Sequence, residues 1–153
     1  MEDAAVFEAA APDVQARIRS LFEHQPLMRH LGASLGLISP GRVHIVLPSR
    51  PEISQQHGFI HAGAACAIAD SAGEYAALTM LGRDDADLLG IEYKVNFLAP
   101  AKGDHLEAVG AVMRSGRTLT VCTFEVFGIQ GTQRSLVAAG QQTLIQVEKR
   151  PGS

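Results

Sequence analysis

The sequence has 153 residues, of which 46% are hydrophobic and 19% charged, and its formal net charge is −3 at pH 7. This composition is typical of one globular domain with a substantial core, and it excludes a disordered chain. The sequence has no basic run and few aromatic residues, which argues against nucleic acid as the main partner. No apolar stretch reaches the ~18 residues that a membrane span needs, so we expect no membrane partner.

The N-terminus and the cysteines indicate the compartment. The first residues, MEDAAVFEAAAPD, are acidic where a secretory signal is basic, and they contain no apolar run. We therefore expect a cytoplasmic protein. Cys66 and Cys122 follow no disulfide or metal spacing, and we interpret them as small buried hydrophobic residues. His57 and His61 are four residues apart but have no evident third ligand, so we expect no metal and no other cofactor.

The first predicted element is a helix that Asp13 caps and that runs to about His30. Pro26 is expected to kink it or to end its regular part. Four apolar residues fall on one face of this helix, as packing against a core requires: Val14, Ile18, Leu21 and Phe22.

The next elements are a hairpin and a loop. Alternating apolar residues in 33–38 and 42–48, with Pro40-Gly41 between them, predict two antiparallel strands. Residues 49–60 are rich in turn formers and are predicted to be a loop.

A long helix is predicted from about His61 to Leu81, with Gly82 as its C-cap residue. The stretch RDDAD, residues 83–87, is expected to be an exposed turn. Four strand-like runs then follow, separated by hairpin breaks. They are Leu88–Leu98, His105–Arg114, Thr118–Gly128 and Ser135–Val147.

The long helix is unusual because most of its side chains are small. Alanine dominates it, and Gly73 costs about 1 kcal/mol relative to Ala inside a helix. Small residues fill little volume but let another backbone approach closely, so we expect a curved antiparallel sheet to wrap the helix. The open sheet edges then need cover, and a dimer that joins two sheets edge to edge supplies it.

The predicted fold class is therefore α+β, with a long central helix, a curved antiparallel sheet around it and an N-terminal helix. We expect a single domain overall. It divides into an N-terminal helical segment (1–30), the sheet-and-helix domain (31–147) and a short tail (148–153).

Polar groups gather where the loop meets the long helix. They are Gln55, the backbone of residues 61–63, Asp70 and Glu74. The helix N-terminus has unpaired N–H groups and a partial positive charge, which suits a polarised carbonyl or an oxyanion. Asp70 lies eight residues after Ala62, roughly 12 Å further along the helix, so one chain cannot place both at one substrate atom. Two antiparallel helices of a symmetric pair can do so.

These residues carry a resemblance to a known family. The pattern Q-x-x-G-x-x-H-A-G-x6-D, from Gln55 to Asp70, resembles the N/Q-x-x-G-x-x-H-G-G-x6-D/E signature of hotdog-fold acyl-CoA thioesterases. The branch is the PaaI-type, also called the 4-hydroxybenzoyl-CoA thioesterase superfamily. The stretch EYKVNFLAPAKG, residues 92–103, and the last two strands are similar to the same family. The resemblance covers roughly residues 30–147.

The resemblance implies catalytic roles for five residues. Asp70 would be the catalytic carboxylate, as a general base toward water or as a nucleophile toward the thioester. The backbone N–H at Ala62, next to Gly63, would bind the thioester oxygen from the neighbouring subunit. Gln55 would help to place the water or the carbonyl. His61 would orient the turn or touch the thioester.

The resemblance also implies substrate contacts. Glu74 takes a position that often lines the site in relatives, and a solvated or interface charge is the alternative. Basic residues near the turn at Arg114 and Arg117 often meet the nucleotide of CoA in relatives, although a solvated turn is the simpler reading. Three further candidate contacts come from the loop, the helix and a strand: Phe59, Tyr75 and Asn96.

The sequence departs from the family pattern at three places. Ala62 replaces the first Gly of H-G-G, which leaves the backbone N–H in place. Gly90 stands near the position where some members carry a hydroxyl residue. Glu74 adds a second carboxylate one turn after Asp70, and burial of both would raise the pKa of one of them.

The implied function is an acyl-CoA thioesterase that acts as a dimer or tetramer, with its site at the subunit interface. Two alternatives remain open at this point. One is a hotdog acyl-thioester hydratase or dehydratase, which needs a histidine paired with an acid. The other is a non-catalytic acyl-CoA-binding module.

Overall fold

The computed structural model describes residues 7–82 and 86–149. Its elements, in chain order, are α1 (Pro12–Glu23), α2 (Pro26–Leu31), β1 (Ser34–Ser39), β2 (Arg42–Pro48), the 3-10 turn η1 (Pro51–Ile53), α3 (Ala62–Leu78), β3 (Ala86–Phe97), β4 (His105–Ser115), β5 (Leu119–Gln130) and β6 (Gln133–Glu148). The predicted hairpin, the long helix and the four later strands are confirmed. Each strand begins and ends within two residues of its predicted bounds, whereas the long helix ends three residues early. The 49–60 loop additionally contains η1 and a single bridge between Ser54 and Ile60.

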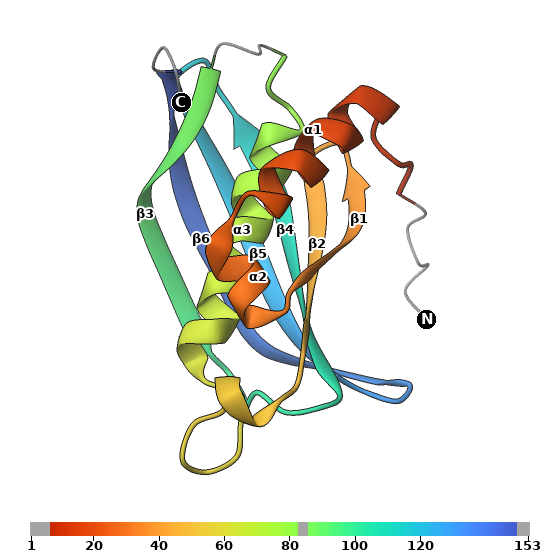
Figure 1. Ribbon diagram of the computed structural model, residues 1–153. Coiled ribbons are helices and arrows are strands. Elements are labelled where there is room, and N and C mark those ends of the chain that lie inside the picture. Colours follow the sequence, from red (N-terminus) through yellow and green to blue (C-terminus); the bar gives the residue numbers. More distant parts are fainter. Residues whose placement is uncertain (1–6, 83–85, 150–153) are drawn as a thin grey trace.

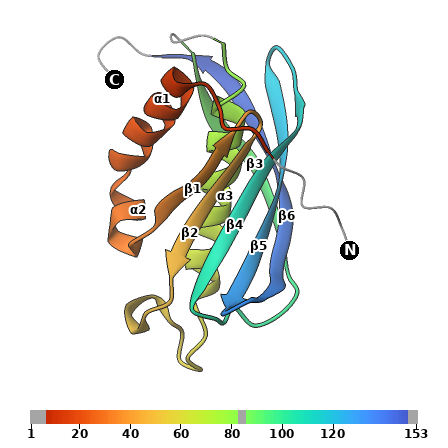
Figure 2. The same ribbon diagram turned by 90° about the vertical axis from the view of Figure 1, so that its right-hand side faces the viewer.

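The strands form one antiparallel sheet in the order β1-β2-β4-β5-β6-β3. The sheet curves around α3, which crosses its inner face (Figures 1 and 2). The two edges of the sheet are therefore β1 and β3. This arrangement confirms the predicted α+β hotdog architecture.

Close contact between α3 and the sheet explains the small residues of the helix. A Cβ built on Gly110 of β4 would lie 2.3 Å from the carbonyl carbon of Ala72 and 2.4 Å from the N of Gly73. The backbones of α3 and β4 thus meet without side chains between them. Ala72 and Ala76 are completely buried in this contact region and belong to the core.

The N-terminal segment forms two helices. The predicted interruption at Pro26 is confirmed, since α1 ends at Glu23 and Pro26 begins the separate helix α2. The predicted cap at Asp13 is wrong. The N-cap of α1 is Ala11, with Pro12 in the first position, where a missing N–H costs nothing. Asp13 is consequently an acidic residue of the first turn and not the cap.

These two helices cover the side of α3 that the sheet leaves open (Figure 1). The rings of Phe22 and Tyr75 pack with their centroids 6.0 Å apart, and the Ser71 hydroxyl donates to Gln25 Oε1 at 3.2 Å. Ile18 is fully buried, whereas Leu21 is 40% exposed and so does not join the predicted apolar face.

The end of α3 also differs from its prediction. The helix stops at Leu78, and Thr79 is its C-cap, with the Thr79 hydroxyl donating to Ala76 O at 2.6 Å. Arg17 donates to the carbonyls of Leu78 and Leu81, at 2.7 and 3.2 Å. Gly82 is therefore not the capping residue. The predicted 83–87 turn lies partly outside the described residues, and Ala86 already begins β3.

Candidate active site

The first turn of α3 presents one free backbone donor. His61 is the N-cap, with φ −61° and ψ 137°, and its Nδ1 accepts the N–H of Gly63 at 2.8 Å. The His61 carbonyl accepts the N–H groups of Ala64 and Ala65. Among the described residues, the N–H of Ala62 finds no acceptor, and Ala62 is exposed. The geometry therefore favours Ala62 over Gly63 as the donor to a substrate oxygen.

The loop before α3 is held by its own hydrogen bonds. The N–H of Gln55 donates to Phe59 O at 2.8 Å, and the N–H of Gly58 donates to Gln55 O at 2.9 Å. Gly58 has φ +82°, which glycine adopts without strain. The side-chain oxygen of Gln55 accepts the N–H of His57. The Gln55 amide NH₂ is thus the part of this side chain that can face a substrate.

The loop is also fixed at its base. The N–H of His61 donates to Ile53 O and that of Ile60 to Ala101 O, both at 2.8 Å. These bonds tie the helix start to η1 and to the loop after β3. A pocket of about 300 Å³ lies beside this turn, between α2, η1 and α3, and His61, Gly63 and Ala67 are among its lining residues.

Asp70 and Glu74 lie together in a second pocket, between α3 and β3. This pocket has a volume of about 430 Å³, and residues 90–93 of β3 form its other wall. Burial raises the pKa of Asp70. The pKa of Glu74 is raised further, to about 7, by its burial and by the negative charges of Asp70 and Asp87. Glu74 is therefore the member of the carboxylate pair that holds its proton near neutral pH.

The two halves of the predicted site are separate within one chain. The donor at Ala62 belongs to the first turn of α3, and Asp70 lies two turns later in a different pocket. At a rise of 1.5 Å per residue, Ala62 and Asp70 are roughly 12 Å apart along the axis of α3.

Other predicted substrate contacts do not meet in either pocket. Tyr75 is buried against Phe22, on the side of α3 that faces α1. Asn96 points to the outer face of the sheet, because residues alternate along β3 and Tyr93 faces α3. Phe59 is half-buried in the loop, near the helix start. Arg114 and Arg117 are exposed at the β4–β5 turn, at the end of the sheet opposite the start of α3 (Figure 1).

Two residues that the motif did not include contact the middle of α3. The Tyr93 hydroxyl donates to Cys66 O at 3.3 Å, and Gln142 Nε2 donates to Asp70 O at 3.2 Å. Tyr93 and Gln142 are register partners on β3 and β6. The sequence signal that could have found Gln142 is a glutamine at an inward-facing position of an apolar strand.

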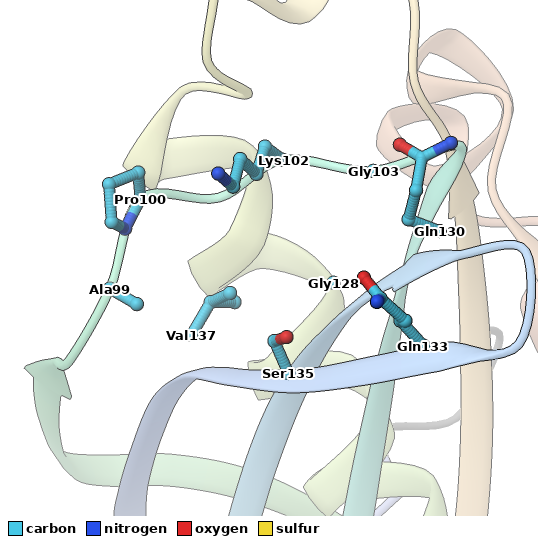
Figure 3. A pocket seen from close by; sticks show the side chains of 9 residues that line it. All are labelled: Ala99, Pro100, Lys102, Gly103, Gly128, Gln130, Gln133, Ser135 and Val137. Carbon is cyan, nitrogen blue, oxygen red and sulfur yellow. The ribbon is translucent and has the colours of Figure 1, made fainter.

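A third pocket lies between the loop after β3 and the β5–β6 hairpin (Figure 3). Its volume is about 430 Å³, and Lys102 lies on one wall while Gln133 and Ser135 lie on the opposite wall. It holds no carboxylate and none of the predicted catalytic residues, so it is distinct from the two pockets on α3. Within the described part of the chain, no three His, Cys, Asp or Glu residues group as metal ligands. No helix of residues 7–82 or 86–149 is long and apolar enough to cross a membrane.

Comparison with known proteins identifies the family. The model of the thioesterase superfamily matches residues 57–134. A thioesterase family protein from Silicibacter pomeroyi is 36% identical, with a TM-score of 0.85 over 89% of this chain and 99% of that one. A Halobacterium salinarum relative named "Putative esterase" is 31% identical over 76% of this chain and 79% of its own. The Escherichia coli PaaI protein, 19% identical, shares the fold, with a TM-score of 0.78 over 88% of this chain and 93% of its own.

The chain belongs to the thioesterase superfamily. Its family membership makes it a hydrolase of the thioesterase class, and the resemblance found in the sequence to hotdog-fold thioesterases is confirmed.

Proposed function

We propose that this protein hydrolyses acyl-CoA thioesters to a carboxylic acid and CoA, in a site built by two copies of the chain. The observation that carries the proposal is the combination of a free N–H at Ala62 and a pocket-lining carboxylate at Asp70, at the spacing of the family motif. Family membership supports the reaction class, and the geometry supports the roles.

The β3 edge supports association of two copies. Twelve residues of β3 have a neighbouring strand on one side only. Leu89, Ile91 and Phe97 of this strand are 53%, 56% and 54% exposed. A long apolar edge is open to pairing with another strand. Antiparallel pairing of β3 with a second β3 makes the two α3 helices antiparallel, so the start of one helix approaches the middle of the other.

The proposed reaction uses Ala62 of one subunit and Asp70 of the other. The Ala62 N–H donates to the thioester oxygen, which gains negative charge as the carbonyl carbon is attacked. Asp70 takes a proton from water as the water oxygen bonds to the carbonyl carbon. The C–S bond then breaks, and the proton passes from Asp70 to the departing sulfur, so that CoA leaves as the thiol and Asp70 is restored. If Asp70 attacks directly instead, the mixed anhydride that forms is cleaved by water. Both routes require Asp70 without its proton.

His61 supports hydrolysis over hydration. Because Nδ1 accepts from Gly63, the proton of the neutral ring is on Nε2. His61 is thus committed as a helix cap and is poorly placed to act as the base of a hydratase.

The test measures thiol release from short, medium, long and aryl acyl-CoA. A general base contributes typically about 10²–10⁴-fold, so Asp70→Asn is expected to lose that much in kcat. Glu125→Gln, which changes an exposed carboxylate on β5, is the matched control and should retain normal turnover. Binding of acyl-CoA without any thiol release would instead favour the non-catalytic binding module, and near-normal turnover by folded Asp70→Asn would remove the catalytic role of Asp70.

A further inference from the structure

Gln142 lies in an unusual contact under the middle of α3. Its side chain is on the inner face of β6, and the residue is 1% exposed. Nε2 donates to Asp70 O, while Oε1 is buried without a hydrogen-bond partner in the described structure. A buried acceptor without a partner is unfavourable for folding.

The helix makes room for this amide at Gly73. A Cβ on Gly73 would lie 2.6 Å from Gln142 Oε1 and 2.8 Å from its Cδ, so an alanine cannot occupy this position without movement. Glycine inside a helix is itself unfavourable. The contact between Gly73 and Gln142 thus combines two features that lower the stability of the fold: a glycine inside a helix and a buried amide oxygen without a partner. It lies three residues after Asp70. Such departures are expected where a site constrains the structure.

Tyr93 makes the neighbouring contact. Its hydroxyl donates to Cys66 O, four residues before Asp70, and its ring stacks on Phe124 with centroids 4.9 Å apart. A carbonyl oxygen can accept a second hydrogen bond beside its helical one. Tyr93 and Gln142 therefore each donate a hydrogen bond to a main-chain carbonyl of α3. The two carbonyls belong to successive turns, on the side of the helix that carries Asp70.

We propose that Gln142 and Tyr93 are positioning residues that set the height and rotation of Asp70 over the sheet. This inference rests on the proposed thioesterase function. Tyr93 belongs to β3, the strand along which two copies are proposed to pair. The contacts consequently link the position of Asp70 to the interface across which it must meet Ala62 of the other subunit.

The test compares kcat, KM and thermal unfolding for Gln142→Met, which keeps the side-chain length and removes the amide. A small misplacement of a reacting group can cost about 10²-fold, so we expect kcat to fall about 10- to 100-fold with KM changed less than about 2-fold. The unfolding midpoint is expected to stay at or above that of the wild type, because the unpaired Oε1 is gone. Gln141→Met, a change at the exposed neighbouring position, is the matched control and should leave kcat unchanged.

Tyr93→Phe removes only the hydroxyl, and it tests the same inference if Gln142→Met fails to fold. The inference is overturned if kcat of the folded variants stays within about 2-fold of the wild type, or if kcat falls only in step with the unfolding midpoint. A wild-type protein that cleaves acyl-CoA through Asp70 while both variants remain normal refutes the positioning role alone. A wild-type protein that cleaves no acyl-CoA refutes the proposed function first.

Discussion

The two sides of α3 differ sharply in how they meet the sheet. Toward β4, the helix backbone touches the strand directly at Ala72 and Gly110, and no polar side chain intervenes. Toward β3, the helix carries Asp70 and Glu74 beside an open pocket. The first side fixes where the helix lies. The second side uses that fixed position to hold carboxylates at a partly exposed edge.

The tight side should be the more sensitive to an added methyl group. Gly110→Ala places a Cβ 2.3 Å from the Ala72 carbonyl, and overpacking of this kind typically costs about 1–3 kcal/mol. Gly90→Ala on β3 is the matched change on the open side, where the nearest atom to the new Cβ would be 3.9 Å away. Denaturant unfolding should show a clear loss for Gly110→Ala and a change within about 0.5 kcal/mol for Gly90→Ala. Equal losses would contradict the difference between the two sides.

The open side should show a distinctive pH dependence of stability. The pKa of Glu74 rises from its ordinary value of 4.5 to about 7 on folding. Between these values the folded chain keeps a proton that the unfolded chain has lost, so the free energy of unfolding falls as pH rises through this window. Glu74→Gln, which imitates the protonated form, should match the wild type near pH 4 and be more stable near pH 8.

Glu107 on β4 is the control, because its pKa shifts on folding in the direction opposite to that of Glu74. The hydrogen bond from His44 Nδ1, at 2.8 Å, lowers the pKa of Glu107, and Arg134 lies 3.1 Å from the same carboxylate. Its stabilisation is present above the ordinary value of 4.5 and is lost as pH falls through the lowered pKa. Glu107→Gln should therefore be less stable than the wild type near neutral pH. If Glu74→Gln and Glu107→Gln change the free energy of unfolding in the same direction near neutral pH, the pKa values of the two carboxyl groups are not shifted in opposite directions.

The smallest expected effect concerns the nucleotide of CoA. If Arg114 and Arg117 contact its phosphates, replacing each with Gln should raise KM for acyl-CoA by about 2- to 5-fold, as for an exposed ion pair. KM for the matching acyl-pantetheine should not change, because that substrate has no nucleotide. Lys102→Gln is the control at the pocket in Figure 3. A rise in KM for this variant alone would place the phosphates there.

The sequence was sufficient for the main architecture because the patterns are strong. Alternation in the strands and the alanine-rich run from Ala62 onward predicted the hairpin, the long helix and four strands. The two predicted helix caps were wrong because another nearby residue takes each role. Pro12 begins α1 one residue before Asp13, and the hydroxyl of Thr79 caps α3 before the chain reaches Gly82. The division of the chain at residues 30 and 147 stays a prediction.

The candidate site was predictable only where a motif carries it. Gln55, His61, Ala62 and Asp70 follow from spacing, and the structure adds that the Gly63 N–H is already occupied by His61. Tyr93 and Gln142 contact α3 through strand register, which depends on pairing between distant segments. Tyr75 packs against Phe22 of α1, and this contact could not be foreseen, because the path of α1 over α3 is a tertiary feature that helix periodicity does not reveal. Its contact with substrate stays a prediction.

The most direct test asks whether one active site needs two chains. Ala62→Pro removes the proposed N–H donor at a helix position that accepts proline, and the ψ of 137° at His61 is already suited to a following proline. Differently tagged Ala62→Pro and Asp70→Ala subunits can be co-expressed, and the mixed dimer isolated through both tags.

Each variant alone should be folded and nearly inactive in thiol release. The mixed dimer should recover about half of the wild-type activity, since one of its two sites then combines an intact Ala62 with an intact Asp70. A mixed dimer as inactive as its parents, or a fully active Ala62→Pro protein, would contradict a site shared between subunits.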